Sequence, residues 1–120
     1  MEPSTAHSVD EQQLYDLNME ISNAENRGDH KWLTNTLAPC LAFQRGNPER
    51  TVDDRDAYLR KIAAGGTRET RSIDTIKIYG NRAIITCIVK GNDGLDYHNL
   101  RLFIRRDGSW RLLGWANEPA

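Results

Sequence analysis

The second half of the chain constrains the fold most strongly, because it is a series of strand-like runs separated by short turn signals. The runs are 72–79 (SIDTIKIY), 82–90 (RAIITCIVK), 96–106 (DYHNLRLFIRR) and 109–117 (SWRLLGWAN). All are rich in the β-branched and aromatic residues that favour strands. Between them stand GN at 80–81, GNDG at 91–94 and DG at 107–108, which tolerate the positive φ angles of hairpin turns. The sequence therefore predicts a meandering antiparallel sheet.

A long amphipathic helix is predicted near the N-terminus. Ser8 and Glu11 have the spacing of a capping box at its start, and Gly28 stands where it should end, after about Arg27. Its apolar stripe, spaced by three and four residues, is Leu14, Leu17, Ile21 and Ala24. This spacing buries one face of the helix.

A second, shorter helix is expected after the N-cap Asp29, and Pro39 prevents its continuation. Its apolar side is formed by Trp32, Leu33 and Leu37. A strand is predicted over 40–45, with Leu41 and Phe43 on one face.

A third helix is expected before the meander, capped by Thr51 or Asp53. Tyr58 and Ile62 lie one turn apart on its buried side, and the glycine pair at 65–66 allows it to end. Three helical segments followed by a meander indicate an α+β fold. With 120 residues and 38% hydrophobic content, we expect a single domain over 8–120 after a disordered tail, 1–7.

Composition argues against several classes of partner. Sixteen Lys and Arg nearly balance seventeen Asp and Glu, so no basic surface for nucleic acid is expected. No segment has the apolar length of a secretion signal or a membrane helix, which predicts a cytoplasmic protein without membrane contact. Cys40 and Cys87 form no CxxC pair, and His7, His30 and His98 are scattered, so reduced thiols, no metal and no cofactor are expected.

The register of the last hairpin follows if Asp107 and Gly108 form a two-residue turn, because Arg106 then pairs with Ser109. One face would carry the pairs Leu100–Trp115, Leu102–Leu113, Ile104–Arg111 and His98–Asn117. The other would carry Arg105–Trp110, Phe103–Leu112, Arg101–Gly114 and Asn99–Ala116. Since both faces hold large apolar residues, neither should remain fully in water.

The second of these faces is predicted to turn inward, because Gly114 and Ala116 leave room opposite Arg101 and Asn99. A sheet curled over helices would form a cavity there, closed at one end by the bulky residues 103, 110 and 112. A buried Arg101 needs an acceptor. Either a ligand carboxylate supplies it, or an internal acid does, and the candidate acids are Asp74 and Glu20.

The predicted ligand-binding residues are Arg101, Asn99 and Tyr97, with Phe43 as an apolar wall. Leu100 and Leu102 would face outward and form a homodimer through the sheet, since burying apolar area favours association. His98 is expected on that outer side. The sequence thus predicts a cavity on one face of the sheet and a partner chain on the other.

Several strings resemble the nuclear transport factor 2-like superfamily, including its SnoaL-like and small uncharacterised members. They are NRGDHKWLTNTLAP (26–39), LAFQR (41–45), YGNRAIITC (79–87) and RLFIRRDGSWRLLGWAN (101–117), within a resemblance that covers about 8–118. The resemblance implies a cone-shaped, cystatin-like fold with helices packed on a curved antiparallel sheet. The chain is also similar to the association domain of calcium/calmodulin-dependent kinase, where an Arg at the position of Arg101 points into the cone.

The resemblance implies no single activity. The acid-base positions of steroid delta-isomerases fall near Ile21, Arg45 and Leu100 or Arg101, where no matching pair stands, and epoxide hydrolase chemistry is not evident either. Three readings stay open. The leading one is a homodimeric binding protein for a small anionic or aromatic molecule. The others are an isomerase, dehydratase or hydrolase that uses a base such as His98 with Asp96 or Asn117, and an association module without a ligand.

Overall fold

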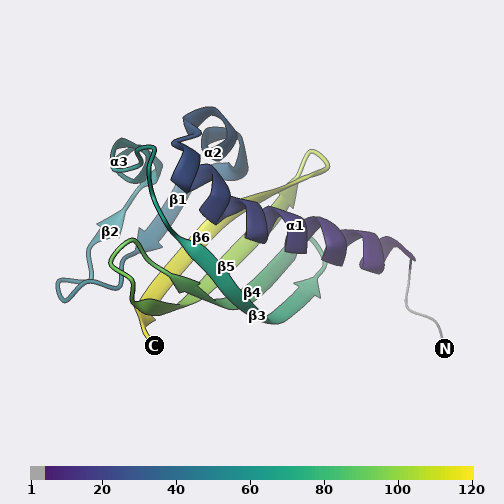
Figure 1. Ribbon diagram of the computed structural model, residues 1–120. Coiled ribbons are helices and arrows are strands. Elements are labelled where there is room, and N and C mark those ends of the chain that lie inside the picture. The colour runs from purple at the N-terminus through teal and green to yellow at the C-terminus, as the bar shows by residue number, and fades with distance from the viewer. Residues whose placement is uncertain (1–4) are drawn as a thin grey trace.

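The computed structural model describes residues 5–120 and contains three helices and six strands. In chain order they are α1 (Thr5–Arg27), α2 (His30–Thr36), β1 (Leu37–Gln44), β2 (Val52–Asp53), α3 (Arg55–Arg60), β3 (Glu69–Tyr79), β4 (Arg82–Lys90), β5 (Asp96–Arg106) and β6 (Ser109–Pro119). The strands form one curved sheet in the order β2-β1-β6-β5-β4-β3 (Figure 1). The predicted α+β layout is confirmed.

The sheet is mixed, not wholly antiparallel as predicted. Strands β3 to β6 form the expected antiparallel meander. Strand β1, however, pairs with β6 in parallel, and the two-residue β2 pairs antiparallel with β1 at the edge. The connection that places β1 beside β6 spans most of the chain, so no local turn signal announces it.

Helix α1 lies across one face of the sheet, while α2 and α3 pack near one end (Figure 1). The predicted stripe is confirmed, since Leu14, Ile21 and Ala24 are fully buried and Leu17 packs against the core. None of the described helices is long and apolar enough to cross a membrane.

The start of α1 corrects one prediction. The helix begins at Thr5, so Ser8 lies inside it and is not its N-cap. Of the tail predicted for 1–7, residues 5–7 belong to α1, and residues 1–4 lie outside the described part of the chain. The helix ends at Arg27 before Gly28, whose φ of 68° is a conformation that glycine adopts easily.

The caps of the two short helices were predicted with mixed success. Asp29 caps α2 as expected, because its Oδ1 accepts from the Trp32 amide at 3.0 Å. The N-cap of α3 is Asp54, whose Oδ1 accepts from the Ala57 amide at 2.8 Å, and neither Thr51 nor Asp53 takes this role. Asp53 instead closes β2 and forms ion pairs. The helix also ends earlier than expected, at Arg60.

A β-bulge in β6 changes the predicted register of the last hairpin. Pairing follows the prediction from Arg106–Ser109 to Phe103–Leu112 and then shifts by one residue at Leu113. Beyond the bulge, Leu102 lies opposite Gly114 and Arg101 lies opposite Trp115. Trp115 therefore joins the inner face, where it was not expected, while the glycine moves to the outer face.

Candidate functional site

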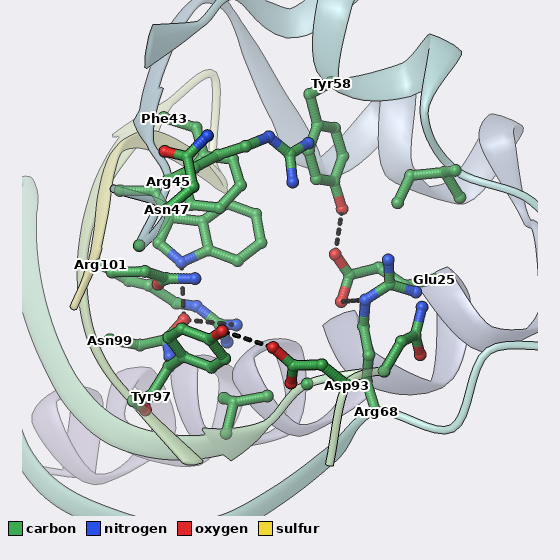
Figure 2. A pocket seen from close by; sticks show the side chains of 17 residues that line it. Glu25, Phe43, Arg45, Asn47, Tyr58, Arg68, Asp93, Tyr97, Asn99 and Arg101 are labelled. Atoms are coloured by element: carbon green, nitrogen blue, oxygen red, sulfur yellow. Dashed lines mark hydrogen bonds and ion pairs between the residues drawn. The ribbon is translucent and has the colours of Figure 1, made fainter. Parts of the chain in front are cut away.

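A cavity of about 340 Å³ opens at the end of the cone where β1, β4 and β6 finish and β5 begins (Figure 2). Its walls combine aromatic, aliphatic and charged side chains from α1, α3, β1, β4, β5, β6 and the loops beside them. The lining residues are Glu25, Phe43, Arg45, Gly46, Asn47, Tyr58, Ile62, Arg68, Val89, Gly91, Asn92, Asp93, Tyr97, Asn99, Arg101, Trp115 and Asn117. Its volume falls within the range of small-molecule sites.

The four residues predicted as ligand-binding all line this one cavity. Asn99 and Arg101 are buried on the inner face of β5, whereas the side chain of Leu100 is 48% exposed on the outer face. Tyr97 stands at the mouth, and the buried Phe43 forms part of the wall. The inward orientation of residues 99 and 101 is therefore confirmed, and a ligand there stays a prediction.

Arg101 is fully buried, and all its acceptors among the described residues are neutral. Its Nη1 donates to the carbonyl oxygen of Asn18 at 3.3 Å and to Oδ1 of the same residue at 2.8 Å. Its Nη2 donates to Asn99 Oδ1 at 3.4 Å, and the guanidinium carbon lies 4.6 Å from the centre of the Trp115 ring. The remaining nitrogen, Nε, is buried and has no hydrogen-bond partner among the described residues.

Neither internal acid proposed for Arg101 reaches it. Glu20 pairs with Arg27 at 2.7 Å on the exposed side of α1, and Asp74 accepts from Ser72 at 3.3 Å. Within the described residues, Arg101 forms no ion pair. A buried guanidinium without a carboxylate is costly, which makes this position the most unusual charge in the core.

Trp115 is a wall of the site that sequence reasoning placed on the wrong face. Because of the bulge, its ring stacks on Phe43 with 4.0 Å between centres and an angle of 20° between planes. Its Nε1 donates to Asn99 Oδ1 at 2.7 Å, the same oxygen that faces Arg101. Asn99 therefore holds both the indole and the guanidinium in place.

The opposite wall contains an acid that the sequence analysis missed. The Glu25 side chain is buried, accepts from the Tyr58 hydroxyl at 2.6 Å, and lies 3.7 Å from Arg68 Nε (Figure 2). Burial, together with the adjacent Glu25 charge, raises the pKa of Tyr58 well above its ordinary value. The phenol thus stays protonated and donates to the carboxylate.

The helical period could have revealed these polar residues. Asn18 follows Leu14 by four, and Glu25 follows Ile21 by four, so both lie on the apolar stripe of α1. Polar residues on a buried face need partners. The structure shows that Asn18 and Glu25 find them in Arg101 and in the Tyr58–Arg68 pair respectively.

The mouth is built from two loops and the side chain of Tyr97. A Cβ atom on Gly46 would lie 2.9 Å from the Tyr97 ring, and one on Gly91 would lie 3.2 Å from it, so the ring fits between two glycines. Its hydroxyl donates to the exposed Asp93. That hydrogen bond is the main reason that the pKa of Asp93 is lowered and the pKa of Tyr97 is raised.

A second charged cluster stands beside the mouth. Burial alone would raise the pKa of the Asp53 carboxyl, but hydrogen bonds from Arg45 and Lys61 outweigh it and leave the pKa below its ordinary value. This cluster joins β1, β2 and the end of α3. Arg45 thus has a protein carboxylate as its partner, which it shares with Lys61, whereas Arg101 has none among the described residues.

His98, the base suggested for an enzyme, does not line the cavity. It lies exposed on the outer face of β5, opposite Glu118 and not Asn117 as predicted. Both cysteines are free thiols, with Cys40 exposed and Cys87 buried. Within the described residues no cluster of three or more His, Cys, Asp or Glu side chains is arranged to hold a metal ion.

These features define the class of the fold, which is nuclear transport factor 2-like with a cystatin-like arrangement of helices on a curved mixed sheet. No protein-family model matches the sequence. A search of curated proteins found no match either. The fold that the resemblance implied is nevertheless confirmed by solved structures.

Three solved structures illustrate the similarity. A nuclear transport factor 2-like protein of unknown function from Silicibacter pomeroyi has a TM-score of 0.82 at 17% identity, over 98% of this chain and 100% of its own. A cystatin-like member from Novosphingobium aromaticivorans has a TM-score of 0.77 at 15% identity, over 95% and 84%. A calcium/calmodulin-dependent kinase II association-domain-like protein from Exiguobacterium sibiricum has a TM-score of 0.73 at 17% identity, over 100% and 97%. At these identities the similarity shows the fold alone.

Proposed function

We propose that this protein is a homodimeric binding protein whose cavity holds a small carboxylate. The observation that supports this proposal is the unpaired charge of Arg101, which forms the floor of the cavity. Arg101 is fully buried, lines the cavity and forms no ion pair with a described residue. A bound carboxylate would neutralise this charge. Guanidinium groups bind carboxylates through parallel hydrogen bonds, which suits a planar acid.

The donors of Arg101 allow such a contact. Among the described residues its Nε has no hydrogen-bond partner, and its Nη2 makes only a long bond of 3.4 Å to Asn99; because Nε is itself buried, a carboxylate would bind by displacing the atoms that cover this edge. A carboxylate that meets this edge of the guanidinium would use donors that the fold leaves largely unused. The apolar flanks of the ligand would pack on Phe43 and the stacked Trp115.

The proposal is tested with pairs of ligands that differ only in charge. Benzoate and phenylacetate should bind by calorimetry and raise the melting temperature of the native chain, whereas benzamide and phenylacetamide should do neither. Arg101→Met, which keeps most of the buried volume, should remove the response to the acids. Arg101→Lys should weaken it, since an ammonium lacks the planar fork.

Two results would refute the proposal. One is equal binding of acids and amides by the native chain, and the other is unchanged acid binding by Arg101→Met. Binding is measured on variants whose circular dichroism shows a folded chain. Chemical conversion of a bound acid, followed by mass spectrometry, would move the protein to the enzyme class, and the absence of any ligand would favour the association module.

The homodimer is proposed on the apolar outer face of the sheet. Ile84 and Leu100 are 43% and 48% exposed there, and Leu102 lies between them with Gly114 and Ala116 beside it. Strands of nine to eleven residues give this four-stranded face an area of roughly 500–700 Å². That is close to the ~800 Å² per partner of a standard interface, so a second copy is the fitting occupant.

Light scattering after gel filtration tests this interface. The native chain should have the mass of a dimer, and Leu100→Glu or Leu102→Lys should give a folded monomer, because both place a charge at its centre. Leu95→Glu is the matched control, since Leu95 is 61% exposed in the β4–β5 turn away from this face. A dimer that survives both central substitutions would contradict the interface.

A further inference from the structure

We infer that the ligand is a hydroxylated monocarboxylate, whose carboxylate meets Arg101 while its hydroxyl donates to Glu25 across the cavity. This inference rests on the proposed carboxylate site and extends it to the far wall. In Figure 2, Arg101 with Asn99 stands on one side of the cavity and Glu25 with Arg68 on the other. The two sides offer different unused groups: Arg101 has hydrogen-bond donors that are little used, and Glu25 has an acceptor that is not used.

The spare acceptor is Glu25 Oε1. The other oxygen, Oε2, accepts from the Tyr58 hydroxyl at 2.6 Å, whereas the nearest cation to Oε1 is Arg68 Nε at 3.7 Å, beyond hydrogen-bond length. Among the described residues no donor lies within hydrogen-bond distance of Oε1. Because Glu25 lines the cavity, a ligand hydroxyl in the cavity would donate to one of the free lone pairs of Oε1.

The charges along the cavity decide between a hydroxyl and an ammonium group. Glu25 already faces Arg68, and Asp53 already faces both Arg45 and Lys61, so the carboxylates of these two groups are already paired. The charged residues that line the cavity are three arginines, at 45, 68 and 101, and two acids, Glu25 and Asp93. Asp93 is exposed to water at the mouth and accepts from Tyr97. Among the residues that the structure describes, Arg101 alone is a buried cation without a counter-charge. The ligand charge that balances the cavity is therefore minus one, which a single carboxylate supplies and which leaves the far end uncharged.

The spacer between the two ends should be flat and apolar. The indole of Trp115 stacks on Phe43, and the remaining apolar lining comes from Ile62 and Val89, both buried. An aromatic ring or a short unsaturated chain packs on such walls and keeps the polar ends apart. A cavity of about 340 Å³ accommodates a ligand of this kind.

The test compares 4-hydroxyphenylacetate, phenylacetate and 4-methoxyphenylacetate by calorimetry. The native chain should bind the hydroxylated acid at least about tenfold more tightly than the other two, because a hydrogen bond to a buried carboxylate is strong. The methoxy acid has similar size and polarity but no donor, so it separates hydrogen bonding from packing. Glu25→Gln should reduce the preference to less than about threefold, and the matched control Glu20→Gln, on the exposed side of α1, should leave it unchanged.

Tyr58→Phe provides a second variant in case Glu25→Gln does not fold. It removes the donor that competes for Glu25, so the preference for the hydroxyl should persist or grow. Loss of the preference in Tyr58→Phe would assign the hydroxyl to the phenol and overturn the inference. So would a preference that survives intact in Glu25→Gln.

The outcomes also separate this inference from the proposed function. If the three acids bind the native chain equally and all depend on Arg101, the carboxylate site stands and the role of Glu25 is refuted. If none of the three binds at millimolar concentration, both are refuted. If only the hydroxylated acid binds, and Arg101→Met and Glu25→Gln each weaken it, both are supported.

Discussion

Two tyrosine–carboxylate hydrogen bonds line the same cavity and differ in their exposure to water. The Tyr58 hydroxyl donates to Glu25 at 2.6 Å, with Tyr58 1% and Glu25 4% exposed. The Tyr97 hydroxyl donates to Asp93, which is exposed on the β4–β5 turn. Replacing each tyrosine with phenylalanine removes one hydroxyl and keeps the ring. The pair of variants therefore measures how much burial adds to one type of hydrogen bond.

Tyr58→Phe should lower the free energy of unfolding by about 1.5–3 kcal/mol, because a hydrogen bond to a charged group is lost, and because Tyr58 and Glu25 are nearly buried, water replaces that bond poorly. Tyr97→Phe should lower it by less than about 0.5 kcal/mol, since water solvates Asp93 once the phenol is gone. For a chain of this length 1 kcal/mol corresponds to roughly 3–5 °C in melting temperature. Tyr58→Phe should thus melt roughly 5–15 °C below the native chain, and Tyr97→Phe within roughly 3 °C of it.

Urea denaturation followed by fluorescence and circular dichroism gives both free energies, and calorimetry gives the melting temperatures. Equal losses in the two variants would refute the reasoning, because burial would then not decide the strength of the bond. A loss below about 0.5 kcal/mol in Tyr58→Phe would show that Glu25 does not need this donor. Measurements on the Tyr58→Phe/Tyr97→Phe double variant would show whether the two effects add.

Two further predictions concern residues outside the cavity floor. Asp53→Asn should cost about 1–2 kcal/mol at pH 7, since Arg45 and Lys61 lose their common acceptor but remain partly exposed to water. The pKa of Asp53 is below its ordinary value of 3.8 in the folded chain, so this stabilisation is fully present above about pH 5 and is lost as the pH falls through the folded pKa. Urea titrations at pH 7, 5 and 3 should show that the difference in free energy of unfolding between the native and variant chains becomes smaller only at pH 3. Gly80→Ala should lower the free energy of unfolding by about 1 kcal/mol, because Gly80 has a φ of 61° but open space around it. Gly28→Ala should lower it more, because Gly28 has a φ of 68° and an added Cβ would also lie 2.8 Å from a backbone nitrogen. Equal losses of unfolding free energy in urea would show that this close contact adds nothing.

Local patterns in the sequence predicted most elements correctly. The period of α1, the four runs of the meander and their turns are determined by neighbouring residues, and the structure reproduces them. The inward side of β5 was also predicted, because alternation along a strand depends only on residue parity. Positions were harder to predict to within one residue, as the cap of α3 shows. Residues 52–54 read VDD, and only the three-dimensional path of the chain decides which aspartate caps the helix and which pairs with Arg45.

The partners of Arg101 were beyond local reasoning. Asn18 reaches it from α1, distant in sequence, and the indole of Trp115 reaches it only because β6 contains one extra residue. Counting outward from the turn assumes a regular ladder, and nothing in the string RLLGWAN distinguishes a bulge from continued pairing. The bulge therefore changes the surroundings of Arg101. Gly114 was expected to leave a hollow opposite it, but the ring of Trp115 fills that place.

If the cavity binds a ligand as proposed, that change alters the kind of ligand expected there. With a glycine opposite Arg101, the guanidinium would be reached from above, and a bulky anion such as a phosphate would fit over it. With the Trp115 ring centre 4.6 Å from its carbon, the guanidinium is covered on that face, so a ligand would have to approach its edge, where the buried Nε has no partner among the described residues. Planar carboxylates bind guanidinium edges in this way. The extra residue at Leu113 therefore favours a flat acid over a tetrahedral anion. The native chain should bind phenylacetate more tightly than phenylphosphonate, and competition calorimetry measures this difference directly. Tighter binding of the phosphonate would contradict the argument.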